Sequence, residues 1–172
     1  MTRDNKKLLF ATDLSKECKE SYFYAIKLAM AFQGSMTLLH VIDTPPVTME
    51  MQVKNLLGDE RYEQIMRNHE NDARSILIGK RKESEIIQSA LYQFCEDSVK
   101  AGPGCHLQPD EILVRKGEIV QTILSTAKEK ESDLIVLSSH KASALAPAFS
   151  RVIKKVLLHS PVPVIVVPPS GK

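Results

Sequence analysis

Two short apolar runs decide the fold of this chain: Leu8–Thr12 (LLFAT), which leads into Asp13, and Leu134–Leu137 (LIVL), which leads into Ser138. Both runs are apolar throughout instead of alternating, a pattern typical of strands buried on both faces of a parallel sheet. When two such strands lie side by side in an open α/β sheet, their carboxyl ends form a crevice that binds ligands. Asp13 and Ser138 are therefore the first candidates for a binding site.

Three further strands and the helices between them complete an alternating pattern. The strands are predicted at 36–42, 111–115 and 162–167, and the shorter helices at about 15–32, 117–127 and 147–159. Such alternation favours a five-stranded parallel sheet with right-handed crossovers and helices on both faces. Five strands with this wiring commonly adopt the order 3-2-1-4-5, which places the crevice between the first and fourth strands. Pro163, at the start of the last strand, indicates an edge position.

The middle of the chain is less regular. Residues 47–58 carry apolar side chains without a clear period, so we expect a loop there, either a partner-facing lid or a loop packed over its own core. From Asp59 to about Lys100 the pattern is helical, and Gly79 is a point where the helix bends or divides. We expect residues 1–172 to form a single domain with this extended helical region at about 59–100.

Composition and charge exclude several classes of protein. The chain is 43% hydrophobic and 26% charged, with 23 Lys+Arg, 21 Asp+Glu and a formal net charge of +2. This balance does not favour nucleic acid as a partner, and we interpret the Lys80-Arg81-Lys82 cluster as a solvated helix surface. The apolar runs are far shorter than a membrane span, and no apolar leader precedes the first strand. We expect a cytoplasmic location and no membrane contact.

The three cysteines do not form a disulfide framework or a zinc site, because their number is odd and no CxxC spacing occurs. Cys18 and Cys95 fall on or beside apolar helix faces and are predicted to be small core residues. Cys105 lies in the turn at 102–106 and is the one thiol that we expect to be exposed.

Four stretches, taken in order, resemble the universal stress protein (UspA-type) family. That family opens with an apolar strand followed by Ala-Thr/Val-Asp-Gly-Ser, and this chain has Ala-Thr-Asp-Leu-Ser at 11–15. Leu39-His40-Val41 resembles the second strand, Gly117 the exit of the third, and residues 159–167 (HSPVPVIVV) the ending. The likeness covers nearly the whole chain and is weakest over 44–110. It implies an adenine nucleotide alpha hydrolase-like fold and a regulatory role in the stress response.

The resemblance also implies a phosphate-binding loop, which is altered in this chain. Nucleotide-binding members carry Gly-x2-Gly-x9-Gly-Ser/Thr after the fourth strand, where this chain has Ser138, Lys141, Ser150 and Arg151, with a spacer of eight residues. Glycine suits such loops because it adopts positive φ and lets a phosphate approach without a Cβ clash. Lys141 and Arg151 can neutralise phosphate charge. The loss of all three glycines nevertheless weighs against tight ATP binding in the family's usual pose.

The residues that the resemblance places around the adenine match the family pattern better than the phosphate-binding loop does. Asp13 matches the acidic residue after the first strand, with Ala11 beside it, and Val41 matches the residue whose backbone meets the adenine. Asp13 has an alternative reading as a capping or solvated carboxylate. His140 is expected to be a phosphate-facing or surface residue, because neighbours on one loop rarely form a catalytic triad. The predicted nucleotide-binding set is Ala11, Asp13, Val41, Ser138, His140, Lys141, Ser150 and Arg151.

Two functions remain open. The first is a regulatory module that binds ATP or another adenine nucleotide, with Mg²⁺ present only through bound phosphates. The second is an interaction protein of the same fold that binds no nucleotide and acts through protein partners. An enzyme is not favoured, because the chain has no Walker sequence and fold analogy alone is a weak argument.

The resemblance finally implies a homodimer formed by antiparallel pairing of the last strands, at 162–167. Such pairing would cover an edge that is otherwise an aggregation hazard. The alternative is that the prolines after this strand protect the edge without a partner.

Overall fold

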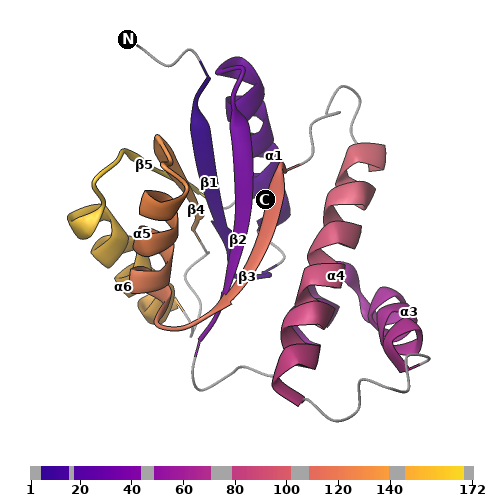
Figure 1. The fold of residues 1–172 in the computed structure, drawn as a ribbon. Helices are drawn as coiled ribbons and strands as arrows, with labels where there is room; N and C mark the ends of the chain where they lie inside the picture. Colours follow the sequence, from indigo (N-terminus) through magenta and orange to yellow (C-terminus); the bar gives the residue numbers. More distant parts are fainter. Residues whose placement is uncertain are drawn as a thin grey trace.

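One parallel sheet organises the molecule. The computed structural model describes residues 5–15, 18–43, 49–70, 79–101, 109–139 and 146–168. The strands within them are β1 (Lys7–Thr12), β2 (Ser35–Ile42), β3 (Glu111–Lys116), β4 (Leu134–Ser138) and β5 (Val164–Val167). They form a five-stranded sheet in the order β3-β2-β1-β4-β5, and every pairing is parallel (Figure 1). The predicted fold class and strand order are confirmed.

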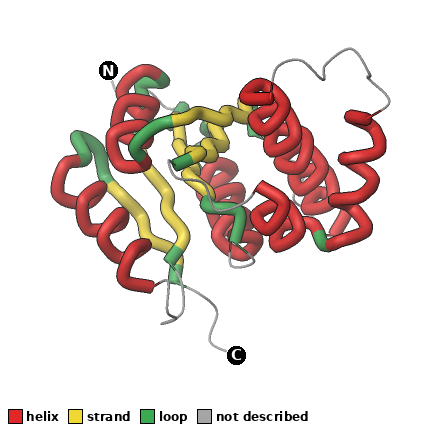
Figure 2. Tube along the Cα trace, turned by 90° about the horizontal axis from the view of Figure 1, so that it is seen from below, coloured by secondary structure: helices red, strands yellow, loops and turns green. Residues whose placement is uncertain are grey.

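Helices cover both faces of the sheet (Figures 1 and 2). They are α1 (Cys18–Ala31), α2 (Met49–Leu57), α3 (Asp59–Glu70), α4 (Gly79–Ala101), α5 (Ile119–Glu129) and α6 (Ala146–His159). The helices α1 to α4 pack on one face and α5 with α6 on the other. Along β1, Leu8 and Phe10 face the first layer and Leu9 faces the second. Because both faces are buried, β1 and β4 show continuous apolar runs in the sequence.

Helix α1 buries the stripe that its spacing predicts. Five of the expected residues are buried against the sheet: Cys18, Tyr22, Ala25, Ile26 and Ala29. The helical spacing also predicts a buried Phe32, but this prediction is wrong, because the helix ends at Ala31 and Phe32 remains 42% exposed in the following turn.

The turn between α1 and β2 depends on Gly34, although Gly34 does not supply the left-handed residue. Gln33 takes the positive φ of 48°. The Gly34 N–H donates to the carbonyl of Ala29 at 2.8 Å, and Ser35 N donates to the carbonyl of Lys6 at 2.9 Å. A Cβ on Gly34 would overlap the backbone carbonyl of Lys6. Glycine is therefore required here by close backbone approach.

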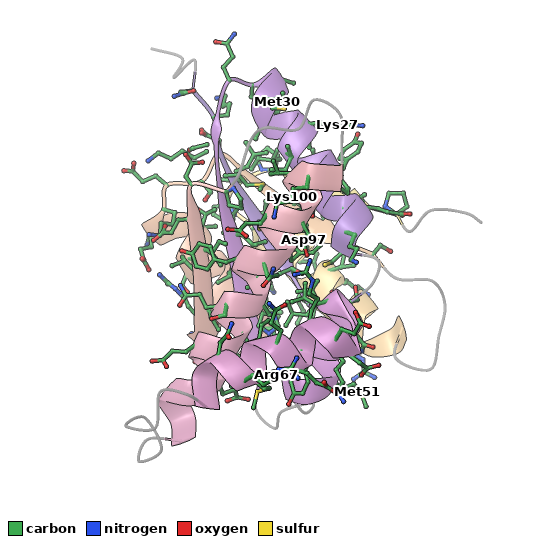
Figure 3. The ribbon with its side chains drawn as sticks, turned by 90° about the vertical axis from the view of Figure 1, so that its right-hand side faces the viewer. Lys27, Met30, Met51, Arg67, Asp97 and Lys100 are labelled. Carbon is green, nitrogen blue, oxygen red and sulfur yellow. The ribbon has the colours of Figure 1, made fainter. Side chains whose placement is uncertain are left out.

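The expectation of a loop over 47–58 is wrong for the part that the structure describes. Residues Met49–Leu57 form α2, and Val53 and Leu56 are fully buried in the core. Met51 is 56% exposed on the outer side of this layer (Figure 3), which obscures the helical period. Residues 44–48 lie outside the described part.

The predicted helical region contains two helices, α3 and α4, and residues 71–78 between them are not described. In α4 the helical spacing of the sequence predicts one apolar stripe, and all four of its residues are buried: Ile87, Leu91, Phe94 and Ser98. Arg61 of α3 donates to Asp97 of α4 at 3.4 Å. The two helices pack together (Figure 1). The Lys80-Arg81-Lys82 side chains and the turn with Cys105 lie outside the described residues. No helix among those described is long and apolar enough to cross a bilayer.

Candidate functional site

The candidate site lies at the carboxyl edge of the sheet, where β1 ends between β2 and β4. Ala11 of β1 pairs with Leu39 of β2 on one side and with Leu137 of β4 on the other. The exits of these strands are thus aligned along one edge. The crevice expected between the first and fourth strands is the switch point of this sheet.

A tight turn follows β1 and carries Asp13. The Leu14 N–H donates to Thr12 Oγ1 at 3.2 Å, and the Ser15 N–H donates to Asp13 Oδ1 at 3.0 Å. Leu14 has a left-handed backbone, with φ of 63°, and its side chain is fully buried. Oδ1 of Asp13 therefore has a structural role in the turn, which is the alternative reading of this residue. Such local side-chain bonds hold a turn in one conformation.

His40 connects the end of β1 to the end of β2. Its Nδ1 lies 2.9 Å from the carbonyl oxygen of Thr12, so Nδ1 carries the proton. The ring is 1% exposed, and burial lowers the pKa of His40 below its ordinary value. Among the described residues, none is a hydrogen-bond partner of Nε2. His40 is thus a buried, neutral residue that links β2 to the end of β1.

Ser138, at the first glycine position of the loop pattern, directs its side chain toward α1. The Ser21 hydroxyl donates to Ser138 Oγ at 2.8 Å, and both side chains are buried. The next residue, Ser139, donates its backbone N–H to the carbonyl of Val167 at 2.8 Å. The chain is therefore held on two sides as it leaves β4.

The other predicted site residues are divided between the faces of the sheet and α6. Ala11 and Val41 pack on the α5/α6 side, whereas Ser138 lies on the α1 side. Arg151 is exposed on α6. His140, Lys141 and the side chain of Ser150 lie outside the described residues. The binding role of this set remains a prediction.

The buried cysteines have no features of reactive thiols. Burial raises the pKa of Cys18 to about 12 and that of Cys95 to about 11. A thiol is nucleophilic only as the thiolate, so both are inert core residues, as predicted. Within the described residues, no group of three or more His, Cys, Asp or Glu side chains could hold a metal ion.

Three residues that shape the site were not found from the sequence as site residues: Leu14, Ser21 and His40. The sequence held one signal for Ser21: it falls on the buried face of α1, and a buried hydroxyl needs a hydrogen-bond partner. Its partner Ser138 is 117 positions away, and no local pattern reveals that contact.

The sheet order is that of doubly wound α/β proteins, a class that binds ligands at the strand exits beside the switch point of the sheet. The chain belongs to the universal stress protein family, which it matches over residues 4–168. The family assignment made from the four sequence stretches is thus confirmed. No curated protein matches the chain.

Solved structures of universal stress proteins share this fold at low sequence identity. The UspA protein from Lactobacillus plantarum is 19% identical with a TM-score of 0.61, covering 94% of this chain and 97% of that one. A family member from Burkholderia pseudomallei is 15% identical with a TM-score of 0.58, covering 99% and 100%. A universal stress protein in complex with cAMP is 15% identical with a TM-score of 0.57, covering 94% and 95%.

Proposed function

We propose that this chain is a regulatory binding module whose crevice between β1 and β4 takes the adenosine part of an adenine nucleotide. The observation that carries the proposal is the turn after β1. Two side-chain hydrogen bonds and the buried Leu14 hold the turn that carries Asp13 at the carboxyl end of β1. A carboxylate in that place suits the ribose hydroxyls, because it accepts hydrogen bonds from two donors. The structural relative in complex with cAMP supports a ligand of this class.

Recognition of the phosphates contributes little to this proposed affinity. None of the loop's three glycine positions carries glycine in this chain. Ser138, at the first of them, has its hydroxyl bonded to Ser21 on the α1 side. We therefore expect ATP to bind no more than about tenfold more tightly than AMP, a difference of about 1.4 kcal/mol.

Magnesium enters this proposal only through the ligand. The described residues offer no cluster of acidic, histidine or cysteine side chains that fits a metal ion. Mg²⁺ usually keeps several waters and binds through one or two carboxylates together with substrate phosphates. Asp13 would then contribute one ligand at most, and AMP should bind equally well with and without Mg²⁺.

The test is calorimetric titration of nucleotide-stripped protein with ATP plus Mg²⁺, AMP and cAMP. Asp13→Asn keeps an oxygen for the Ser15 N–H but removes the charge, so affinity should fall by about tenfold without loss of stability. Asp110→Asn is the matched control, because Asp110 accepts from the Met36 N–H at 2.7 Å at the opposite end of the sheet. The Asp110→Asn variant should bind the three nucleotides with wild-type affinity.

Two outcomes contradict the proposal in different ways. Absence of heat with all three nucleotides at about millimolar concentration would leave the second candidate, an interaction protein that binds no nucleotide. ATP binding more than about a hundredfold tighter than AMP would show that the altered loop recognises phosphates after all.

A homodimer through β5 is part of the same proposal. The strand Val164–Val167 is an edge of the sheet, and its first three residues are only partly buried. Leu157 and Leu158, near the end of α6, are 51% and 69% exposed. An unpaired apolar edge beside exposed leucines is a surface that favours pairing with a second chain.

The cellular part of the proposal follows from the family. We propose a cytoplasmic regulator of the stress response that has no catalytic activity and acts through protein partners. Fractionation with a tagged chain tests the location. Deletion of the gene followed by growth under starvation and oxidants tests the role, and unaltered growth under every stress would contradict it.

A further inference from the structure

A buried hydrogen bond joins α1 to the end of β4, beside the proposed binding site. Ser21 lies on the buried face of α1, the helix that follows the turn at Asp13. Its hydroxyl donates to Ser138 Oγ, at the end of β4, over 2.8 Å. Ser21 is 2% exposed and Ser138 is 9% exposed. The bond thus connects α1, the helix that follows β1, to the exit of β4 across 117 positions of sequence.

We propose that Ser21 is a positioning residue of the crevice: it holds Ser138 against α1 and thereby sets the gap between the exits of β1 and β4. This inference rests on the proposed nucleotide site and names a residue that supports it. Glycine at position 138 would have no side chain for α1 to hold. In this chain a specific tether replaces that conformational freedom.

Among the described residues, backbone pairing with β5 and a side-chain hydrogen bond to α1 both hold the exit of β4. On the β5 side, Ser138 pairs with Val167, and the Ser139 N–H donates to the Val167 carbonyl. On the α1 side, the Ser21 hydroxyl donates a hydrogen bond to Ser138 Oγ. Without it, a buried oxygen would lose a donor, and the exit should move toward solvent to recover a partner.

The test compares Ser21→Ala with Ser98→Ala. Ser98 is a matched control, because it is also a buried helical serine, and its hydroxyl donates to the Phe94 carbonyl at 2.7 Å within α4. AMP affinity is measured by calorimetry and stability by urea unfolding. Exchange of the Ser139 amide is followed by NMR, with the Ile135 amide, bonded to the Pro163 carbonyl at 3.0 Å, as internal reference.

Ser21→Ala should weaken AMP binding by about tenfold, whereas Ser98→Ala should lose stability and keep its affinity. The Ser139 amide should exchange about tenfold faster in Ser21→Ala, and the Ile135 amide should not change. The double variant Ser21→Ala/Ser138→Ala should bind AMP no more weakly than either single variant, because the two hydroxyls act as one unit.

The outcomes separate this inference from the proposed function. Wild-type protein that binds AMP, with unchanged affinity in Ser21→Ala, would overturn the positioning role of Ser21. Wild-type protein that binds no nucleotide would overturn the proposed function. Exchange of the Ser139 amide would then be the only test of the role of Ser21. Faster Ser139 exchange would support a tether that fixes the β4 exit for another ligand, and unchanged exchange would overturn it.

Discussion

Leu14 combines backbone strain with complete burial. A left-handed conformation costs a residue with a Cβ about 1–2 kcal/mol. Leu14 has φ of 63° and is 1% exposed. Burial of a leucine side chain contributes about 1.5–3 kcal/mol. The two effects offset each other, so a leucine is tolerated where the family's opening pattern has glycine.

This balance predicts an unusual order of stability. Leu14→Ala loses the burial and keeps the strain, so it should destabilise the fold by about 2–4 kcal/mol. Leu14→Gly releases the strain and should be more stable than Leu14→Ala by about 0.5–1 kcal/mol. The control is Leu56, equally buried within α2, where glycine should be worse than alanine by about 1 kcal/mol. Urea unfolding of Leu14→Ala, Leu14→Gly, Leu56→Ala and Leu56→Gly measures these free energies of unfolding. A lower stability for Leu14→Gly than for Leu14→Ala would contradict the prediction.

His40 should make the fold sensitive to mild acid. Burial lowers its pKa, and this outweighs the hydrogen bond to Thr12 and the nearby charges of Asp13 and Glu83, which raise it. The folded state therefore holds a neutral ring at pH values where the unfolded chain takes up a proton. Stability is complete above the ordinary histidine pKa of about 6.5 and falls as pH drops below it, by up to about 1.4 kcal/mol per pH unit.

Urea unfolding at pH 5, 6, 7 and 8 tests the role of His40. His40→Gln should be less stable than wild type at pH 8 but should lose less further stability between pH 7 and pH 5. His159→Gln is the control, because His159 is exposed at the end of α6. An equally steep acid loss in wild type and His40→Gln would assign the effect to other groups.

At the scale of elements, two glycines serve different purposes. Gly34 joins α1 to β2, and a Cβ there would overlap the Lys6 carbonyl. Gly58 joins α2 to α3 with φ of 88°, and no atom lies within 4 Å of its would-be Cβ. Gly58→Ala should therefore cost only the left-handed penalty of about 1–2 kcal/mol. Gly34→Ala should cost more, because backbone must move.

Thermal unfolding of both glycine variants measures the difference. We expect a clearly lower Tm for Gly34→Ala than for Gly58→Ala, since the first change separates β1 from the turn that precedes β2. Equal decreases in Tm for the two variants would mean that the α1–β2 turn accommodates the added Cβ without loss of stability.

At the scale of the whole molecule, the two edges of the sheet differ in charge. The β3 edge carries Glu111, Arg115 and Lys116, and Arg115 donates two bonds of 2.7 Å to Glu129. The β5 edge, Val164–Val167, carries no charge. Charged residues on an edge strand discourage pairing with another chain. Any strand-mediated dimer should therefore form through β5.

The change Val166→Lys tests this assignment. Val166 is half-buried on the edge strand, so a lysine there should be tolerated in the monomer and should oppose pairing with a second β5. Light scattering after gel filtration should show a dimer for wild type and a monomer for Val166→Lys, with unchanged circular dichroism. Arg115→Ala, on the other edge, should remain dimeric. A wild-type monomer at micromolar concentration would contradict the dimer.

Local pattern determined most of the architecture of this protein. The runs at β1 and β4, the stripes on α1 and α4, and the edge position of β5 were predictable, because strand and helix periods directly record which faces are buried. Helix α2 was not predictable, since its exposed Met51 hides the period and only packing selects Val53 and Leu56 for the core.

The candidate site was predictable in place but not in detail. Asp13 and Ser138 end two neighbouring strands, and chain order alone brings such ends to one edge of a parallel sheet. The tertiary structure alone decided the Ser21–Ser138 bond, the His40–Thr12 bond and the left-handed Leu14. The physical reason is that hydrogen bonds between distant segments, and the burial that offsets local strain, depend on contacts that no short stretch of sequence records.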